Sequence, residues 1–158
     1  MAHDYRATVT WERKGAVFTD NKYSRGHVWS FDGGATVPGS SAPSSVPLPY
    51  SVAEAVDPEE ALVAALSSCH MLFFLAFAMK QGFVVDRYVD AAVGEMTRNE
   101  KSRLYISRVT LAPAVVFSGG KRPSQAEFDA LHHDSHEHCY IANSIRAEVV
   151  VNGTMSFA

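Results

Sequence analysis

The stretch that decides the fold runs from residue 57 to residue 82 and reads DPEEALVAALSSCHMLFFLAFAMKQG. Asp57 is a favourable N-cap, and Pro58 suits the first position of a helix because its missing N–H would have no partner there. Two glutamates follow, where the helix dipole favours negative charge. Gly82 is typical of the residue that ends a helix. We therefore expect one long helix between Asp57 and Gly82.

The middle of this helix carries no charge. Between Glu60 and Lys80 there is no Asp, Glu, Lys or Arg. This uncharged stretch is long enough to cross a bilayer. However, Ser67, Ser68, Cys69 and His70 fall at its centre, where polar groups are most costly in lipid. The alternative is a helix buried on all sides, which a small domain seldom achieves alone. We therefore expect no membrane span, and a homodimer in which a second copy covers part of the helix.

The segments on either side of the helix read as strands and one long arm. Apolar and polar residues alternate over residues 5–13 and again over 27–31, as in half-buried strands. Residues 35–50 contain four prolines, which predicts an ordered arm outside any sheet.

After the helix, residues 84–96 and 104–117 read as two long strands, and residues 145–151 as a last strand. Ser124 followed by Glu127 forms a capping box that opens a second helix through Leu131 and the histidines. The sequence predicts an α+β fold with about six strands and two or three helices. We expect residues 1–158 to form a single domain.

Composition excludes some functions. The net charge is −3, and the basic residues are spread along the chain, so no nucleic-acid partner is expected. The N-terminus lacks a secretory pattern, which predicts a cytoplasmic protein. Because the cytoplasm keeps thiols reduced, the two cysteines are either inert packing residues or a redox pair.

The two cysteines lie in different surroundings. Cys69 sits among apolar neighbours, where cysteine is often inert. Cys139 follows a histidine-rich run, in which His132 and His136 share one helical face. That run could bind zinc, but a firm fourth ligand is lacking and a solvated helix face is the simpler interpretation. A non-catalytic protein that binds a small molecule or a metal at residues 132–139 is therefore the alternative function.

Several motifs together resemble the OsmC/Ohr family of organic hydroperoxide resistance proteins. In that family a Pro-Glu pair opens the central helix and the peroxidatic cysteine follows ten residues after the glutamate, as Cys69 follows Glu59 here. The segment from His136 to Cys139 is similar to the one that bears the resolving cysteine. Arg25 falls where the family places its active-site arginine. The resemblance implies antiparallel sheets packed around a long central helix in an intertwined homodimer.

The resemblance also implies a chemistry. Cys69 would attack an organic hydroperoxide, and the resulting sulfenic acid would condense with Cys139 to a disulfide that an external dithiol, with dihydrolipoamide as the family's example, reopens. Arg25 would activate Cys69, and Glu59 would orient Arg25 through a bidentate pair. No cofactor or metal is needed. The simpler interpretations are that Arg25 lies in a surface turn and that Glu59 serves only the helix dipole.

Two observations qualify this scheme. Ten residues of straight helix separate Glu59 from Cys69 by about 15 Å, so we expect Glu59 to serve the Cys69 of a second copy. The sequence leaves open whether Arg25 serves its own chain or the second copy. Many members of the family carry proline after the resolving cysteine, where this chain has Tyr140. This departure concerns the substrate and the reductant rather than the peroxidase chemistry. His70 could be a hydrogen-bond partner of Cys69, and a core histidine is the simpler interpretation.

Overall fold

The computed structural model describes residues 3–158. The chain forms two compact units, one that ends at Ala61 and one that runs from Leu62 to Ala158. The single domain expected over residues 1–158 stays a prediction.

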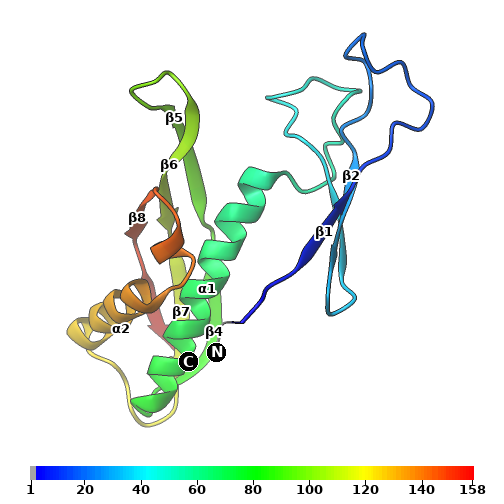
Figure 1. Ribbon diagram of the computed structural model, residues 1–158. Coiled ribbons are helices and arrows are strands. Elements are labelled where there is room, and N and C mark those ends of the chain that lie inside the picture. The colour runs from blue at the N-terminus through cyan, green and yellow to red at the C-terminus, as the bar shows by residue number, and fades with distance from the viewer. Residues whose placement is uncertain (1–2) are drawn as a thin grey trace. The chain divides into compact units, whose positions relative to one another are not determined.

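The first unit contains an antiparallel sheet of three strands in the order β1-β2-β3, visible in Figure 1. The strands are β1 (Ala7–Thr10), β2 (His27–Phe31) and β3 (Thr36–Gly39). The strand predicted at residues 27–31 is confirmed with the same bounds, and the one predicted at residues 5–13 is confirmed in shortened form.

The prediction that residues 35–50 stay outside any sheet was wrong for β3, which contains Pro38. Proline is tolerated because β3 is an edge strand, and the carbonyl of Pro38 accepts a hydrogen bond from the Val56 N–H at 3.0 Å. The nitrogen and oxygen of one strand residue face the same side, so the missing N–H of Pro38 lies on the edge away from β2. The rest of the arm is ordered: the buried Ser40 accepts a hydrogen bond from the Val52 N–H.

The long helix is confirmed as α1 (Pro58–Lys80). Asp57 accepts a hydrogen bond from the Glu60 N–H at 2.8 Å, and the Glu60 carboxylate accepts one from the Asp57 N–H at 3.2 Å, which closes a capping box. At the other end Gly82 has φ +77°, and Phe83 donates its N–H to the Ala78 carbonyl at 3.0 Å. This is the Schellman arrangement that glycine favours.

The surface of α1 is unusually apolar. By length and composition the helix could cross a membrane, and 22% of its most apolar window is buried. Its polar centre is used inside the second unit, where the Ser67 hydroxyl donates to Asp90 and His70 is fully buried. Other positions remain open: the side chains of Leu72 and Met79 are 61% and 65% exposed. The second unit therefore packs the polar centre of α1 and leaves part of its apolar surface exposed.

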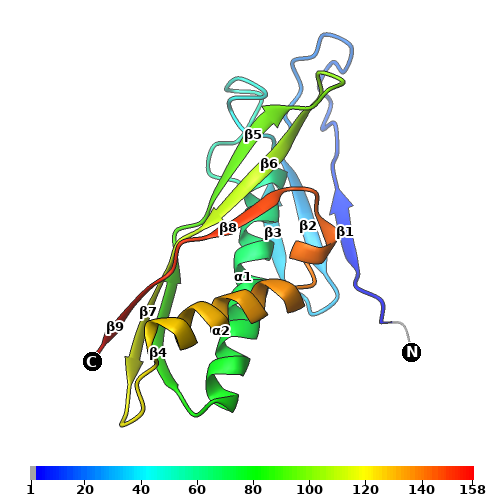
Figure 2. The ribbon, with the colours of Figure 1, turned by 90° about the vertical axis from the view of Figure 1, so that its left-hand side faces the viewer.

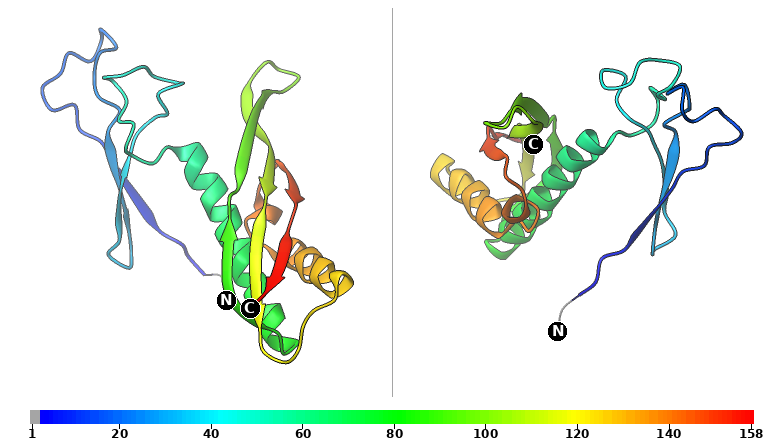
Figure 3. Two further views of the ribbon diagram at one scale, coloured as in Figure 1. Left: turned by 180° about the vertical axis from the view of Figure 1, so that it is seen from behind. Right: turned by 45° about the horizontal axis from the view of Figure 1, so that its top comes forward.

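The second unit holds two three-stranded sheets, with orders β4-β7-β9 and β5-β6-β8. Their strands are β4 (Val84–Asp90), β5 (Val93–Arg98), β6 (Leu104–Leu111), β7 (Pro113–Ser118), β8 (Glu148–Val151) and β9 (Thr154–Phe157). Figure 3 shows the strands of these two sheets alongside α1.

Each of the two long strands predicted after α1 is divided between the two sheets. The division falls at Ala91–Ala92 in the first of these strands and at Ala112 in the second. Asp90 holds this crossing, because one carboxylate oxygen accepts from the Ala112 N–H at 2.7 Å and the other from the Ser67 hydroxyl. The periodicity of the strands continues across the division, so the sequence pattern did not reveal it.

The second predicted helix is confirmed as α2 (Gln125–His138), with both hydrogen bonds of the Ser124–Glu127 capping box in place. A short 3₁₀ helix, η1 (Ala142–Ser144), follows it. The chain ends in two strands where one was predicted, because β8 pairs parallel with β6 and β9 pairs parallel with β7. The sheets are therefore mixed rather than purely antiparallel, and the α+β class is confirmed.

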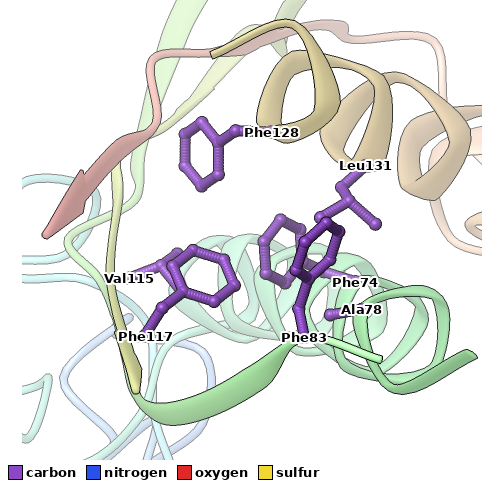
Figure 4. Packing of buried hydrophobic residues seen from close by; sticks show 7 residues of the cluster. All are labelled: Phe74, Ala78, Phe83, Val115, Phe117, Phe128 and Leu131. Atoms are coloured by element: carbon purple, nitrogen blue, oxygen red, sulfur yellow. The ribbon is translucent and has the colours of Figure 1, made fainter. Parts of the chain in front are cut away.

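Two apolar clusters fill the second unit. The first joins α1, α2 and the β4-β7 pair, and Figure 4 shows its residues; they are Phe74, Ala78, Phe83, Val115, Phe117, Phe128 and Leu131. The second has Leu66, Val109, Leu111 and Cys139 at its centre. In Figure 2 α2 crosses α1, and the second cluster joins Leu66 in the middle of α1 to Cys139 at the C-terminal end of α2.

Candidate functional site

The structure brings Cys69 and Cys139 together in the second apolar cluster. Cys69 lies in the middle of α1 and is partly exposed, whereas Cys139 is the C-cap of α2 and is fully buried. Both thiols are free. Residues seventy positions apart in the sequence thus meet because α1 and α2 pack on each other.

Electrostatics distinguish the two thiols. Burial, together with the neighbouring Cys69 thiol, raises the pKa of the Cys139 thiol to about 11. The Ala142 N–H, 3.4 Å from the Cys139 sulfur, acts in the opposite direction. Cys139 is therefore protonated at neutral pH and is a poor nucleophile in this state. The partly exposed Cys69 is the thiol that a substrate can reach.

Local packing explains why Cys139 is held in place. Its N–H donates to the His136 carbonyl at 3.2 Å, and its own carbonyl accepts from both the N–H and the side-chain amide of Asn143, each at 3.0 Å. The Asn143 amide also donates to the Glu137 carbonyl. These bonds close the end of α2 and direct the Cys139 side chain into the cluster.

Arg25 lies in the first unit, on the approach to β2. Its N–H donates to the Tyr50 carbonyl at 2.8 Å, and its carbonyl accepts from the His27 ring at 2.8 Å. The guanidinium donates to the carbonyls of Asn21 and Tyr23 and to the Asn21 side chain, and it lies 3.9 Å from the centre of the Tyr23 ring. Arg25 is thus held by its own segment rather than free at the surface.

Glu59 and Arg25 line the same pocket in the first unit, which has a volume of about 500 Å³. Aromatic side chains form much of its wall; they are Trp11, Phe18 and Tyr23, whose rings pack on one another. Within residues 3–158 no ion pair joins Arg25 to Glu59. The bidentate pair expected from the sequence does not form in the single chain, although both partners face one pocket.

Glu59 and Cys69 share one helix. Because α1 is unbroken from Pro58 to Lys80, the rise of about 15 Å between the two residues is that of a regular helix. The structure therefore divides the expected site residues into two pairs, Cys69 with Cys139 and Arg25 with Glu59.

His70 is the residue whose role sequence reasoning left undecided, and its partner was missed. Its Nε2 atom lies 2.9 Å from Nδ1 of His132, and both side chains are buried. Burial lowers the pKa of each imidazole to about 4, with the nearby His136 lowering that of His70 and Asp90 raising it. The pair is neutral at pH 7. The only sequence signal was two histidines on apolar helix faces, which does not specify a contact.

The histidine run does not form a metal site. Among the residues that the structure describes, no group of three His, Cys, Asp or Glu side chains is placed to hold a metal ion. A pocket of about 370 Å³ does lie beside the run, and His132, His136 and Asn152 contribute to its lining. The structure gives no support to the zinc alternative, and this pocket is the place where a small molecule could bind.

Comparison with known proteins relates this geometry to a family. A family model described as OsmC-like protein matches residues 51–153. The chain is similar to an OsmC-like protein of unknown function from Vibrio cholerae, with 49% identity and a TM-score of 0.94 over 97% of this chain and 100% of that one. Comparison with curated proteins gives no match.

More distant structures share the fold. An OsmC-like protein from Mycoplasma pneumoniae has 14% identity and a TM-score of 0.74, over 98% of this chain and 99% of that one. An organic hydroperoxide resistance protein from Elizabethkingia anophelis has 15% identity and a TM-score of 0.68, over 100% of this chain and 99% of that one. Both similarities concern the fold alone.

Proposed function

The chain belongs to the OsmC-like protein family, and we propose that it is a cysteine-based peroxidase that reduces organic hydroperoxides. The observation that carries the proposal is the meeting of a partly exposed Cys69 with a buried, protonated Cys139 in one cluster. Structural relatives named as organic hydroperoxide resistance proteins support a role in peroxide stress. A packing role alone would not call for two cysteines from separate helices at one point.

The first step is attack by the Cys69 thiolate on the distal oxygen of the hydroperoxide. The sulfur forms a bond to that oxygen, the O–O bond breaks, and the alkoxide that leaves takes a proton to become an alcohol. Cys69 is thereby oxidised to a sulfenic acid while the peroxide is reduced.

The second step joins the two cysteines. The Cys139 sulfur attacks the sulfur of the Cys69 sulfenic acid, a disulfide forms, and the displaced hydroxide leaves as water with the Cys139 proton. An external dithiol then reduces the disulfide by two exchanges and is itself oxidised. Dihydrolipoamide is the reductant to try first. The whole cycle needs no cofactor or metal.

Arg25 and Glu59 complete the site from a second copy of the chain. A fixed guanidinium stabilises a thiolate and the charge that develops on the peroxide oxygens, and a carboxylate can orient it. The pocket already gathers both side chains, and the exposed Leu72 and Met79 of α1 favour apolar cover by a partner. An intertwined homodimer satisfies both needs.

The aromatic wall of this pocket supports the choice of substrate. A volume of about 500 Å³ lined by Trp11, Phe18 and Tyr23 suits a hydroperoxide with an apolar group rather than hydrogen peroxide. We place this reaction in the cytoplasm, where reducing thiols are available to close the cycle.

A non-catalytic binding protein is the second candidate. The pocket beside His132, His136 and Asn152 could take a small molecule. It accounts for the histidine run but leaves the meeting of the two cysteines without a purpose, so we rank it second.

The test is turnover of cumene hydroperoxide with dihydrolipoamide as reductant. The wild type should consume peroxide continuously and prefer cumene hydroperoxide to hydrogen peroxide. The Cys69→Ser variant should consume no peroxide. In the Cys139→Ser variant the peroxide should oxidise Cys69 once, and no internal disulfide should form. Equal and negligible turnover by wild type and Cys69→Ser would rule out the peroxidase and leave the binding protein.

A further inference from the structure

A buried hydrogen bond joins the two helices that carry the cysteines, at a point that the proposed chemistry does not use. His70 directly follows Cys69 on α1. His132 lies on α2, two helical turns before Cys139, the C-cap of that helix. The contact between His70 Nε2 and His132 Nδ1 measures 2.9 Å.

The geometry is that of an in-plane hydrogen bond. The ring planes differ by 11° and the ring centres lie 5.3 Å apart, so with nitrogens 2.9 Å apart the two edges meet. Such a bond requires a single proton between the two nitrogens, so one neutral imidazole donates and the other accepts. His70 is 1% and His132 6% exposed, and the rings of Phe74 and Phe128 flank His132 with centres 4.5 and 4.6 Å away.

This bond is the directional link between the helices. Within residues 3–158 it is the one hydrogen bond between a side chain of α1 and a side chain of α2. Other contacts between the two helices are made by ring faces and edges, such as Phe77 against His138 with centres 5.2 Å apart. Apolar contacts tolerate sliding, whereas a hydrogen bond weakens steeply with distance and angle. The His70–His132 bond therefore fixes how α2 lies on α1.

We propose that His70 and His132 are a positioning pair, which holds the end of α2 so that the Cys139 sulfur meets the sulfur of Cys69. Residue 153 supports the arrangement from the other side. A Cβ added to Gly153 would lie 2.6 Å from His132 Nε2, so the chain packs closely on the imidazole only because residue 153 is glycine. The inference deepens the proposed function, on which it rests for the use of the Cys69–Cys139 disulfide.

The positioning role can be tested without peroxide, through the equilibrium of the protein thiols with oxidised glutathione. Oxidised glutathione converts the two thiols of the protein to a disulfide and is reduced to two molecules of glutathione, so electrons and protons balance. The equilibrium constant reports how well the fold brings the two sulfurs together.

Two variants of His132 differ in where they place a polar group. In His132→Asn the side-chain amide occupies the position of Nδ1, and in His132→Gln it occupies the position of Nε2. We expect the constant of the asparagine variant to stay within about threefold of the wild type and that of the glutamine variant to fall about tenfold. Equal constants for the two variants would overturn the proposal.

A second comparison removes both imidazoles. Because two apolar side chains of similar size can replace a buried hydrogen-bonded pair with little loss of stability, His70→Leu combined with His132→Leu should remain folded. We expect its constant to fall about tenfold or more while its circular dichroism spectrum stays native. A native spectrum with an unchanged constant would contradict the positioning role.

Kinetics with cumene hydroperoxide distinguish this proposal from the proposed function. The double leucine variant should lose the Cys69 thiol as fast as the wild type but form the disulfide more slowly, with Cys69 sulfinic acid accumulating. Failure of the peroxidase would appear as wild-type Cys69 that peroxide leaves intact. The glutathione equilibrium would still test the positioning pair in that case.

Discussion

The two compact units treat their expected site residues differently. In residues 62–158 the pair Cys69 and Cys139 meets inside one chain, within an apolar cluster. In the first unit Arg25 and Glu59 line one pocket, yet Arg25 is bonded to Asn21 and Tyr23 instead of Glu59. The two cysteines thus contact the same cluster, whereas Arg25 and Glu59 share a pocket without forming an ion pair within residues 3–158. The proposal that Arg25 and Glu59 act on the Cys69 of a second copy rests on this difference between the units.

The strongest test of the complete pair is removal of its nucleophile. Cys69→Ser should lower peroxide turnover about a thousandfold or more, because a hydroxyl is not ionised at neutral pH and cannot replace the thiolate. Turnover is followed by loss of cumene hydroperoxide. The matched variant Cys139→Ser should still reduce one peroxide per chain, and equal loss of that first event in both variants would break the distinction between nucleophile and resolving thiol.

The incomplete pair is tested by mixing chains. Arg25→Ala should lower turnover about a hundredfold, because the thiolate and the developing charge lose their guanidinium. Arg25→Lys should recover only part of it, since an ammonium lacks the planar fork. Copies with Arg25→Ala, unfolded and refolded together with copies carrying Cys69→Ser, should regain activity above either variant alone. Absence of recovery in a confirmed mixed dimer would show that Arg25 serves its own chain.

Glu59→Gln should have a smaller effect, on the order of tenfold in turnover, because Glu59 acts through Arg25 and not on the peroxide. Glu60→Gln is the control, since Glu60 caps α1 and does not line the pocket. If the two substitutions lower turnover equally, Glu59 serves only the helix dipole.

The dependence of stability on pH tests the buried pair His70 and His132 in the second unit. The folded-state pKa of His70 and His132 is about 4, below the ordinary 6.5, so the unfolded chain binds more protons between these values. The free energy of unfolding should therefore fall as the pH drops from about 6.5 to about 4, by up to about 1.4 kcal/mol per pH unit for each imidazole. His136 strengthens this effect by lowering the pKa of His70, whereas Asp90 and Asp129 oppose it.

Urea unfolding at several pH values measures that slope. The double variant His70→Leu with His132→Leu should show a flatter dependence than the wild type, because its core carries no such titrating groups. A slope identical to that of the wild type would place the pH dependence elsewhere.

Features that depend on neighbouring residues could be predicted from the sequence, and features that depend on contacts between distant residues could not. The ends of α1 and α2 were predictable because Asp57, Gly82 and Ser124 act on their immediate neighbours. The division of the two long strands was not, because it depends on Asp90 reaching Ser67 and Ala112, a contact between distant residues. Pro38 misled the prediction because its place at a sheet edge is a tertiary property.

The same distinction applies to the residues of the candidate site. Cys69 and Cys139 could be proposed from motif spacing and resemblance, and the packing of α1 on α2 brings them together. The His70–His132 bond had no local pattern, since each histidine lies on an apolar helix face and their contact depends on how α1 and α2 cross. The state of Arg25 depends on hydrogen bonds within residues 21–25 that no motif encodes.

The most direct test of the central claim is a thiol count combined with mass spectrometry after one equivalent of cumene hydroperoxide. The account predicts that both thiols disappear and that the chain becomes lighter by two hydrogen atoms, with Cys69 and Cys139 in one cross-linked peptide. Cys69→Ser should keep its remaining thiol under the same treatment. Survival of both wild-type thiols would contradict the account and make Cys69 a packing residue of α1.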